Sequence, residues 1–252
     1  MTSEYRKVDL HIHTPVSACY EDHLTPQFFT TPQRVIDSAV EAGLEAIAIT
    51  DHNSAEGIDD IRRAAKGNGL VIFPGMELST KGGHMLAIFD VETPTERLRE
   101  LLHHLDMPEE QWGDGYYQLS QWMDEVFITI HQAGGVAIAC HVDRQPRGLV
   151  VSDISTEDKV RIYHSPYLSA LEITDARDKE RWNRGLFPHF SLGRACIQGS
   201  DAHAPFEMGR RPCYLRVPDL SLPGLKLAFQ EYETRISFPG EIRALALEAR
   251  RA

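Results

Sequence analysis

Short apolar runs that end in a histidine recur along this chain, and they constrain its fold more than any other feature. VDLHIH ends in His11 and His13, AIAITDH in His52, VAIACH in His141, and IQGSDAH in His203. Apolar runs of this length are typical of buried strands. Metal-capable side chains that repeatedly follow strands predict a metal site at the rim of a barrel, where the carboxyl ends of parallel strands meet.

Helical segments alternate with these runs, which is typical of an α/β fold with a parallel sheet and right-handed crossovers. AIAIT and VAIAC are apolar on both faces, as in a sheet covered on both sides. No glycine-rich phosphate fingerprint follows the first strand, so a closed barrel is favoured over a doubly wound sheet. The expected strands are 7–13, 46–50, 70–74, 84–89, 136–140, 168–174, 195–199 and 213–217. The expected helices are 31–42, 55–67, 94–105, 117–133, 157–164, 178–185, 222–231 and 240–251.

The first expected helix has clear start and stop signals. Thr31 is the predicted N-cap, Pro32 suits the first turn, and Gly43 ends the helix. Four apolar residues are expected on its buried face: Val35, Ile36, Ala39 and Val40.

The composition is that of a globular protein and predicts one domain over residues 1–252, with a strand-helix extension at about 205–252. Of the 252 residues, 42% are hydrophobic and 25% are charged, which is ordinary. The chain lacks an apolar run of about 18 residues and an apolar leader, so we expect a cytoplasmic protein with no membrane contact. The four cysteines form no CxxC and are expected to be reduced. A net charge of −11 argues against broad attraction to nucleic acid but leaves room for a local basic patch.

Two pairs of residues carry the strongest local signals for a metal. His11 and His13 are separated by one residue on a strand, so both imidazoles point to the same side and can reach one cation. Asp201 and His203 form a second pair with the same spacing after a strand. Glu77, in VIFPGMEL, offers a carboxylate that can bridge two cations.

Three further positions extend the candidate site. His84 follows Glu77 by seven residues across a glycine turn, as a ligand of a second metal would. Of Asp51 and His52, one can be a ligand and the other an orienting group, or Asp51 can cap the next helix. His141 is followed by Arg144, and a metal ligand beside a guanidinium group is the layout expected for binding phosphate.

Six segments, in this order, resemble the successive motifs of the PHP (polymerase and histidinol phosphatase) family: DLHIHT, ITDHN, PGMELS, HMLAIF, ACHVDR and GSDAH. They span residues 9–203. The resemblance implies a distorted (β/α)7 TIM-like barrel that holds two or three divalent cations, zinc, manganese or iron, and hydrolyses phosphoesters.

Carried over position by position, the resemblance implies three groups of ligands. Those of the first cation are His11, His13, Glu77 and Asp201. Those of the second are Glu77, His84 and His141, with Glu77 as the bridge. Those of the third are His52 and His203. Arg144 matches a phosphate-contacting arginine, and we expect Glu77, Asp201 and Arg144 to take part in catalysis.

One departure concerns the third cation. Many members continue the HxH motif with SxxSDG, whose aspartate completes the third site, but this chain has Ala18 at that position. Either the third site is weaker, or a nearby side chain supplies the ligand. The candidates are Cys19, Glu21, Asp22 and His23.

The expected activity is metal-dependent hydrolysis of a phosphoester in a nucleic acid or nucleotide. An acidic surface suits a small phosphorylated substrate, whereas a nuclease needs a basic track. The arginines that could form that track are Arg144, Arg147, Arg161, Arg177, Arg181, Arg184, Arg210 and Arg211. Lys81 or Arg210 is expected to help Arg144 neutralise the phosphoryl oxygens.

The tail suggests a different class of function. Residues 209–236 resemble the end of PHP modules that are fused to, or encoded beside, SMC-like ATPases. The chain would then be the nuclease part or a scaffold of a larger assembly with a separate ATPase. A metal amidohydrolase is a third reading, which the predicted Glu77 bridge and the GSDAH motif disfavour. The oligomeric state is left open.

Overall fold

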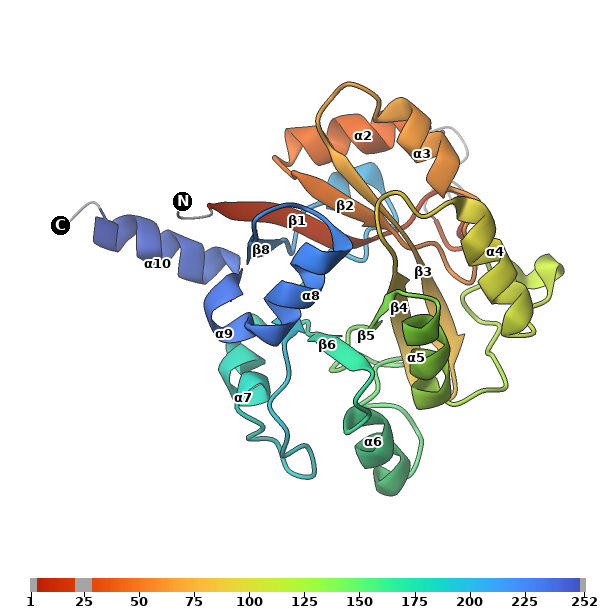
Figure 1. The fold of residues 1–252 in the computed structure, drawn as a ribbon, viewed down its shortest axis with the longest axis vertical. Coiled ribbons are helices and arrows are strands. Elements are labelled where there is room, and N and C mark those ends of the chain that lie inside the picture. Colours follow the sequence, from red (N-terminus) through yellow and green to blue (C-terminus); the bar gives the residue numbers. More distant parts are fainter. Residues whose placement is uncertain (1–3, 21–28, 250–252) are drawn as a thin grey trace.

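The computed structural model describes residues 4–20 and 29–249, and its centre is a curved sheet (Figure 1). Nine strands among these residues follow the order β7-β6-β5-β4-β3-β2-β1-β8-β9. Their bounds are β1 Tyr5–Ile12, β2 Ala46–Ile49, β3 Val71–Thr80, β4 Gly83–Ile88, β5 Val136–Ala139, β6 Leu168–Glu172, β7 Cys196–Ile197, β8 Cys213–Arg216 and β9 Ile236–Ser237. The expected strands are present, and β9 was not anticipated.

The sheet closes on itself almost completely. After β7 the chain returns to β1, where Asp201 N donates to His11 O over 2.9 Å and His13 N donates to Ala202 O over 3.0 Å. Ile12 and Ala202 form a parallel bridge. These contacts join the two ends of the strand order β1 to β7, which confirms the expected distorted α/β barrel.

The sheet is mixed, so the expectation of a parallel sheet was wrong. β1, β2 and β3 are parallel to one another, as are β5, β6 and β7, but β4 is antiparallel to both β3 and β5. The cause is a tight turn at Gly82 and Gly83, whose φ angles of 117° and 130° suit glycine. Because β4 runs backwards, its first residues lie at the rim where the parallel strands end.

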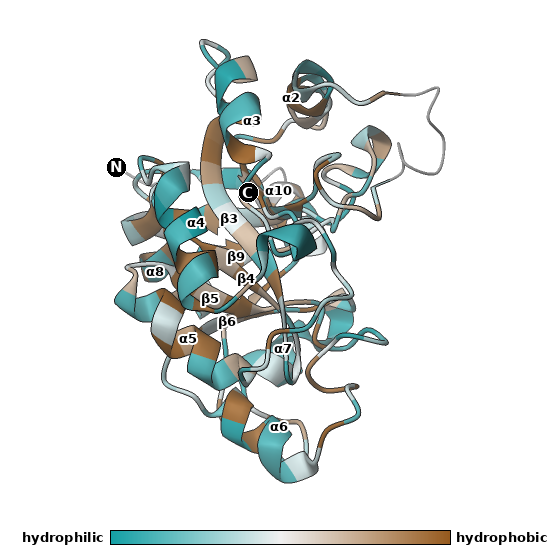
Figure 2. Cartoon of the chain, turned by 90° about the vertical axis from the view of Figure 1, so that its right-hand side faces the viewer, coloured by the Kyte–Doolittle hydropathy of each residue, from teal (hydrophilic) through white to brown (hydrophobic). Residues whose placement is uncertain are grey.

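Helices cover the outside of the barrel. Their bounds are α2 Pro32–Glu41, α3 Ile58–Ala64, α4 Thr95–His104, α5 Met123–Gln132, α6 Thr156–Tyr163, α7 Lys179–Asn183, α8 Leu222–Gln230, α9 Tyr232–Arg235 and α10 Pro239–Ala249. Short 3-10 turns span Glu109–Gln111, Ala176–Asp178 and Pro205–Glu207. Figure 2 shows hydrophilic residues on α3 and α4 and hydrophobic ones along the central strands. In the described ranges, every helix is too short or too polar to cross a membrane.

Helix α2 begins as predicted, but one of its four predicted buried residues is exposed. The Thr31 side chain accepts a hydrogen bond from Arg34 N at 3.2 Å, which confirms the N-cap. Val35, Ile36 and Ala39 are buried, whereas Val40 is 50% exposed and its predicted burial was wrong. At 100° per residue, Val40 points about 90° away from the mean direction of the other three.

The helix expected over 117–133 begins only at Met123. The preceding residues run beside the end of β3 instead. Leu119 N donates to Ser79 O at 2.8 Å, Lys81 N to Gln121 O at 3.1 Å, and Met123 N to Lys81 O at 2.9 Å. These backbone hydrogen bonds replace helical ones, and they hold the segment against the rim of the barrel.

Candidate metal centre

The eight predicted ligand residues meet at one rim of the barrel. They lie at or just beyond the ends of β1, β2, β5 and β7, within β3, and near the start of β4. His203 is partly exposed and the others are buried. The predicted ligands brought together here are His11, His13, His52, Glu77, His84, His141, Asp201 and His203.

The Glu77 carboxylate lies between two sets of imidazoles. Its Oε2 atom is 3.2 Å from His11 Nε2, 3.2 Å from His13 Nε2 and 3.0 Å from His52 Nδ1. Glu77 is fully buried, and within the described residues Oε2 accepts no hydrogen bond of good geometry. A buried carboxylate oxygen without a donor is costly unless a cation satisfies it. The donor set therefore fits a metal ion.

The other oxygen of Glu77 faces the second set. Oε1 is 2.8 Å from His84 Nδ1 and 3.0 Å from His141 Nε2. Cys140 lies in the same group as Glu77 and His141. Burial raises the pKa of the Cys140 thiol well above its ordinary value, so the sulfur is a neutral thiol at pH 7. Two oxygens of one carboxylate thus point to two different groups of nitrogens.

Asp201 completes a group with two histidines. Its Oδ1 atom lies 3.3 Å from His11 Nε2 and 3.2 Å from His13 Nε2, and those two nitrogens are 3.2 Å apart. Ligand atoms at 2.0–2.1 Å from a tetrahedral cation are separated by about 3.3 Å. The spacing therefore matches one cation among His11, His13, Glu77 and Asp201. The guanidinium group of Arg144 donates to the other oxygen, Oδ2.

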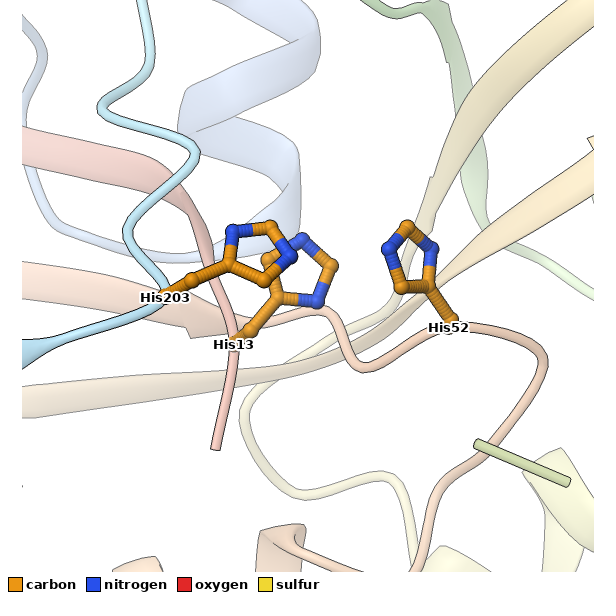
Figure 3. A group of neighbouring side chains, drawn as sticks. All are labelled: His13, His52 and His203. Atoms are coloured by element: carbon orange, nitrogen blue, oxygen red, sulfur yellow. The ribbon is translucent and has the colours of Figure 1, made fainter. Parts of the chain in front are cut away.

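Three histidines form a further group at the outer side of the centre (Figure 3). The rings of His13 and His203 are stacked with their centroids 4.0 Å apart. The ring centroids of His13 and His52 are 4.4 Å apart. Ala18 is exposed and offers no ligand atom. Cys19 lies beside His52, and both residues line a pocket that opens from this centre. The other predicted candidates, Glu21, Asp22 and His23, lie outside the described residues.

A carboxylate that was missed in the sequence lies behind His11. Glu172, the last residue of β6, is buried, and its Oε2 lies 2.7 Å from His11 Nδ1. Its signal was available, because LSALE is another apolar strand that ends in a ligand-type side chain.

Of the alternatives considered for Asp51, the structure shows the orienting role and not the capping of the next helix. Asp51 accepts hydrogen bonds from Thr14 N and from Ser17 Oγ, both at 2.7 Å. Ser17 Oγ also lies 3.0 Å from His13 Nδ1. Helix α3 has Gly57 at its N-cap and no side-chain cap. Asp51 thus positions His13 through Ser17.

Three non-glycine residues beside the centre have left-handed backbone angles. The φ values are 46° at Asn53, 29° at His141 and 53° at Asp201. Each follows the end of a strand, where the unusual angle turns the chain sharply. Such conformations cost about 1–3 kcal/mol each and cluster at functional sites.

The two central carboxylates are ionised. Burial raises the pKa of Glu77, but His11, His52 and His84 outweigh burial and hold that pKa well below its ordinary value. Burial likewise raises the pKa of Asp201, and the adjacent His11 and His13 hold it well below the usual range. Protonated histidines balance these charges in the metal-free centre, and a bound cation would take the place of their protons.

The surroundings of His13 and His203 shift the pKa values of these two residues in opposite directions. Burial lowers the pKa of His13, but contacts with Asp201 and Glu77 outweigh burial and raise that pKa to about 9. Burial also lowers the pKa of His203, and with no compensating effect of similar size it falls to about 3. His203 is consequently neutral at pH 7 and has a lone pair for a metal.

The centre opens into a pocket of about 210 Å³. Its wall includes Arg144, Arg147 and Tyr116 in addition to the ligands. Of the other arginines proposed for a basic track, five are paired with carboxylates: Arg161, Arg177, Arg181, Arg184 and Arg210. Arg211 donates to backbone carbonyls. The arginines therefore do not form one unpaired track.

Comparison with known proteins agrees with this geometry. The family model described as a PHP domain matches residues 9–173, more than half of the chain. An uncharacterized protein of Methanocaldococcus jannaschii is 32% identical over 85 residues, which cover 33% of this chain and 50% of that protein. The chain thus spans about half the length of this relative.

Two solved structures are similar in fold. A lesion-specific endonuclease from Pyrococcus furiosus has a TM-score of 0.72 at 17% identity, covering 93% of this chain and 57% of that one. A two-domain protein of Bacteroides vulgatus containing a predicted PHP-like metal-dependent phosphoesterase has a TM-score of 0.62 at 17% identity, covering 94% of this chain and 65% of that one. With one family model over most of the barrel and a cluster of ligand side chains at its rim, the chain belongs to the PHP domain family.

Proposed function

We propose that the chain hydrolyses phosphoester bonds in a nucleic acid or nucleotide through a centre of two or three divalent cations. The observation that carries the proposal is the position of Glu77, whose two oxygens face two separate groups of imidazoles. A shared carboxylate between two nitrogen-rich groups is the arrangement of a two-metal site. Zinc, manganese and iron all suit these ligands.

Each ligand set has a distinct part in this proposal. His11, His13, Glu77 and Asp201 would hold the first cation. Glu77 would hold the second together with His84 and His141, which both face its Oε1 atom. His13, His52 and His203 surround the third position. When bound, such cations lower the pKa of a coordinated water and stabilise charge on phosphoryl oxygens.

The protein's own contribution is positioning and charge. Arg144 lies on the pocket wall, where its guanidinium can donate two parallel hydrogen bonds to a phosphate. It also pairs with Asp201, so a phosphate that binds there would share the arginine with a metal ligand. Asp51 and Glu172 hold His13 and His11 in place from behind.

The likeness to the Pyrococcus furiosus endonuclease supports a nucleic-acid substrate. The net charge of −11 favours the opposite choice, a small phosphorylated molecule. The cationic side chains of Lys81 and Arg147, which have no partner among the described residues, favour nucleic acid. The SMC-like ATPase partner stays a prediction.

The test is a phosphoester panel that contains single-stranded DNA and RNA, mononucleotides and bis(p-nitrophenyl) phosphate, assayed with Mn²⁺ and with Zn²⁺. We expect hydrolysis of phosphodiesters that is lost in His11→Ala and Asp201→Asn. His104→Ala is the matched control, because His104 is exposed on α4 away from the centre. Metal-loaded protein that hydrolyses nothing on the panel would refute the proposal.

A further inference from the structure

A second pocket adjoins the pocket of the candidate metal centre, called the metal pocket below. It has a volume of about 370 Å³, and both pockets share Pro146 and Arg147 as lining residues. Lys81 and Trp122 lie on its wall, at the turn after β3 and just before α5. A strand of substrate that reaches the cations could therefore continue into this pocket past Arg147.

Arg147 is fixed in position by its backbone. Its carbonyl oxygen accepts a hydrogen bond from His84 N at 2.9 Å. Gly83 packs so closely against the same carbonyl that a Cβ atom would collide with it. Within residues 4–20 and 29–249, the structure gives the Arg147 guanidinium no hydrogen bond or ion pair. A half-buried, unpaired guanidinium group is a ready phosphate ligand.

Lys81 has the same combination of a fixed backbone and a free charge. Its N–H donates to Gln121 O at 3.1 Å, and its carbonyl accepts from Met123 N at 2.9 Å. The side chain is exposed, and its ammonium group has no partner in the described part of the chain. Asp153 also lines the pocket. The positive side chains of Lys81 and Arg147 outnumber the one carboxylate, Asp153, so this pocket has a net positive charge in an otherwise acidic protein.

We infer that this second pocket binds the phosphate next to the one that is hydrolysed, so that the substrate is a polynucleotide strand. The inference rests on the proposed phosphodiesterase function and deepens it. A free mononucleotide carries a single phosphomonoester and would leave Lys81 and Arg147 unused. Only a substrate with consecutive phosphates occupies both pockets.

The experiment compares one phosphodiester with several. The kcat/KM of bis(p-nitrophenyl) phosphate is measured beside that of thymidine oligonucleotides of two to six residues. We expect kcat/KM to rise about tenfold or more once a second phosphate is present, through KM. Lys81→Gln and Arg147→Gln remove this rise, and Lys66→Gln does not, because Lys66 is an exposed lysine after α3 that lines neither pocket. Thermal melting shows whether each variant is folded.

Binding separates this inference from the proposed function. Fluorescence anisotropy of labelled hexathymidylate is measured with Ca²⁺ at several salt concentrations. Each phosphate contact contributes about −0.7 to the slope of log K against log salt for a single strand. A flatter slope in both variants supports the inference, even if the protein hydrolyses nothing. Unchanged binding and an unchanged length dependence in both variants would overturn it.

A different observation concerns Tyr116, which lines the metal pocket and is 81% exposed. Its loop is held firmly at the rim. Asn53 Nδ2 donates to Asp114 O at 2.7 Å and to Tyr117 O at 3.0 Å, and Ser79 Oγ donates to Gly115 O at 2.8 Å. A large ring exposed to solvent on a fixed backbone is unusual for a packing residue.

We propose that Tyr116 stacks on the base beside the hydrolysed phosphate. A fixed aromatic ring at the mouth of a phosphate site suits any base, because every base has a flat face. Tyr116 would thus set a preference for nucleic-acid strands over other phosphodiesters, without a preference for sequence.

The test uses Tyr116→Leu and Tyr116→Phe on an oligonucleotide and on matched strands with one abasic residue next to the cleaved bond. We expect Tyr116→Leu to lower kcat/KM on the intact strand about tenfold. Tyr116→Phe should keep the activity on the intact strand. On the strand that lacks the base next to the cleaved bond, both variants should react at the rate of the unsubstituted protein. Equal losses on intact and abasic strands, or no loss on either, would contradict this role. Anisotropy with the same strands gives the answer if hydrolysis is too slow to measure.

Discussion

Glu172 Oε2 lies 2.7 Å from Nδ1 of His11, on the side of the imidazole opposite the Nε2 atom that faces Glu77 at 3.2 Å. A carboxylate behind a metal-binding histidine fixes the ring's tautomer and orientation and makes it a stronger ligand. The proton is held on Nδ1, and the lone pair of Nε2 is left for the cation.

Substitution of Glu172 should weaken the metal centre without removing a ligand. In Glu172→Gln, the amide oxygen can still accept from Nδ1, but the negative charge is lost. We expect metal affinity to fall about 10–100-fold, measured by competition with a chromophoric chelator. Glu157→Gln, an exposed change on α6, serves as the control. An affinity equal to that of the unsubstituted protein would mean that Glu172 has no influence on the metal.

Metal affinity should rise with pH. A cation binds the neutral imidazole, and burial together with the stronger opposing effect of Asp201 and Glu77 leaves the pKa of His13 at about 9 without metal. Below that pH, a proton must leave His13 before the metal binds. Apparent affinity should therefore increase by about tenfold per pH unit for this proton and level off near pH 9. Calorimetric titrations in buffers of different ionisation enthalpy count the released protons, and an affinity that is flat from about pH 6 to 8 would contradict the assignment.

Removal of metal should lower thermal stability. Without a cation, Glu77 Oε2 and the Nδ1 atoms of His52 and His141 are buried with no hydrogen-bond partner within the described residues. A cation at 100 times its Kd adds about 2.7 kcal/mol to the free energy of unfolding. For a chain of this size we expect the Tm to fall by about 5–10 °C in EDTA, as measured by calorimetry. EDTA should lower the Tm of His11→Ala much less, because this variant has lost a metal ligand. It should lower the Tm of His104→Ala as much as that of the unsubstituted protein.

Gly115 provides a selective test of the third cation position. A Cβ atom there would lie 2.8 Å from the ring of His52. Gly115→Ala should therefore displace His52 and lower the number of bound cations by about one per chain, as counted by elemental analysis. Gly240→Ala has free space around it and is the control. An unchanged cation count would indicate that His52 is not needed for a metal.

The side chains of the candidate centre were predictable because their signals are local. His11 and His13 are separated by one residue at the end of β1, and strand periodicity places them on one side. Asp201 and His203 have the same spacing but lie beyond the end of β7, where the φ of 53° at Asp201 turns the chain, so their closeness to the centre depends on the loop. The helix at Thr31 was equally readable, since a cap, a proline and a glycine act over a few residues. Local signals did not predict the exposure of Val40, because an apolar side chain on a helix is buried only when it points toward the core.

By itself the sequence determined the kinds of ligand, their order along the strands and the family. The tertiary structure decided which groups meet. It reversed β4 and so brought His84 to the rim, and it replaced the first part of a helix by pairing with β3. It also placed Glu172 behind His11, which is 161 residues away, and left Arg147 unpaired among many paired arginines. Short-range periodicity reports which face a side chain takes, whereas its partners come from distant segments that only the closed barrel brings together.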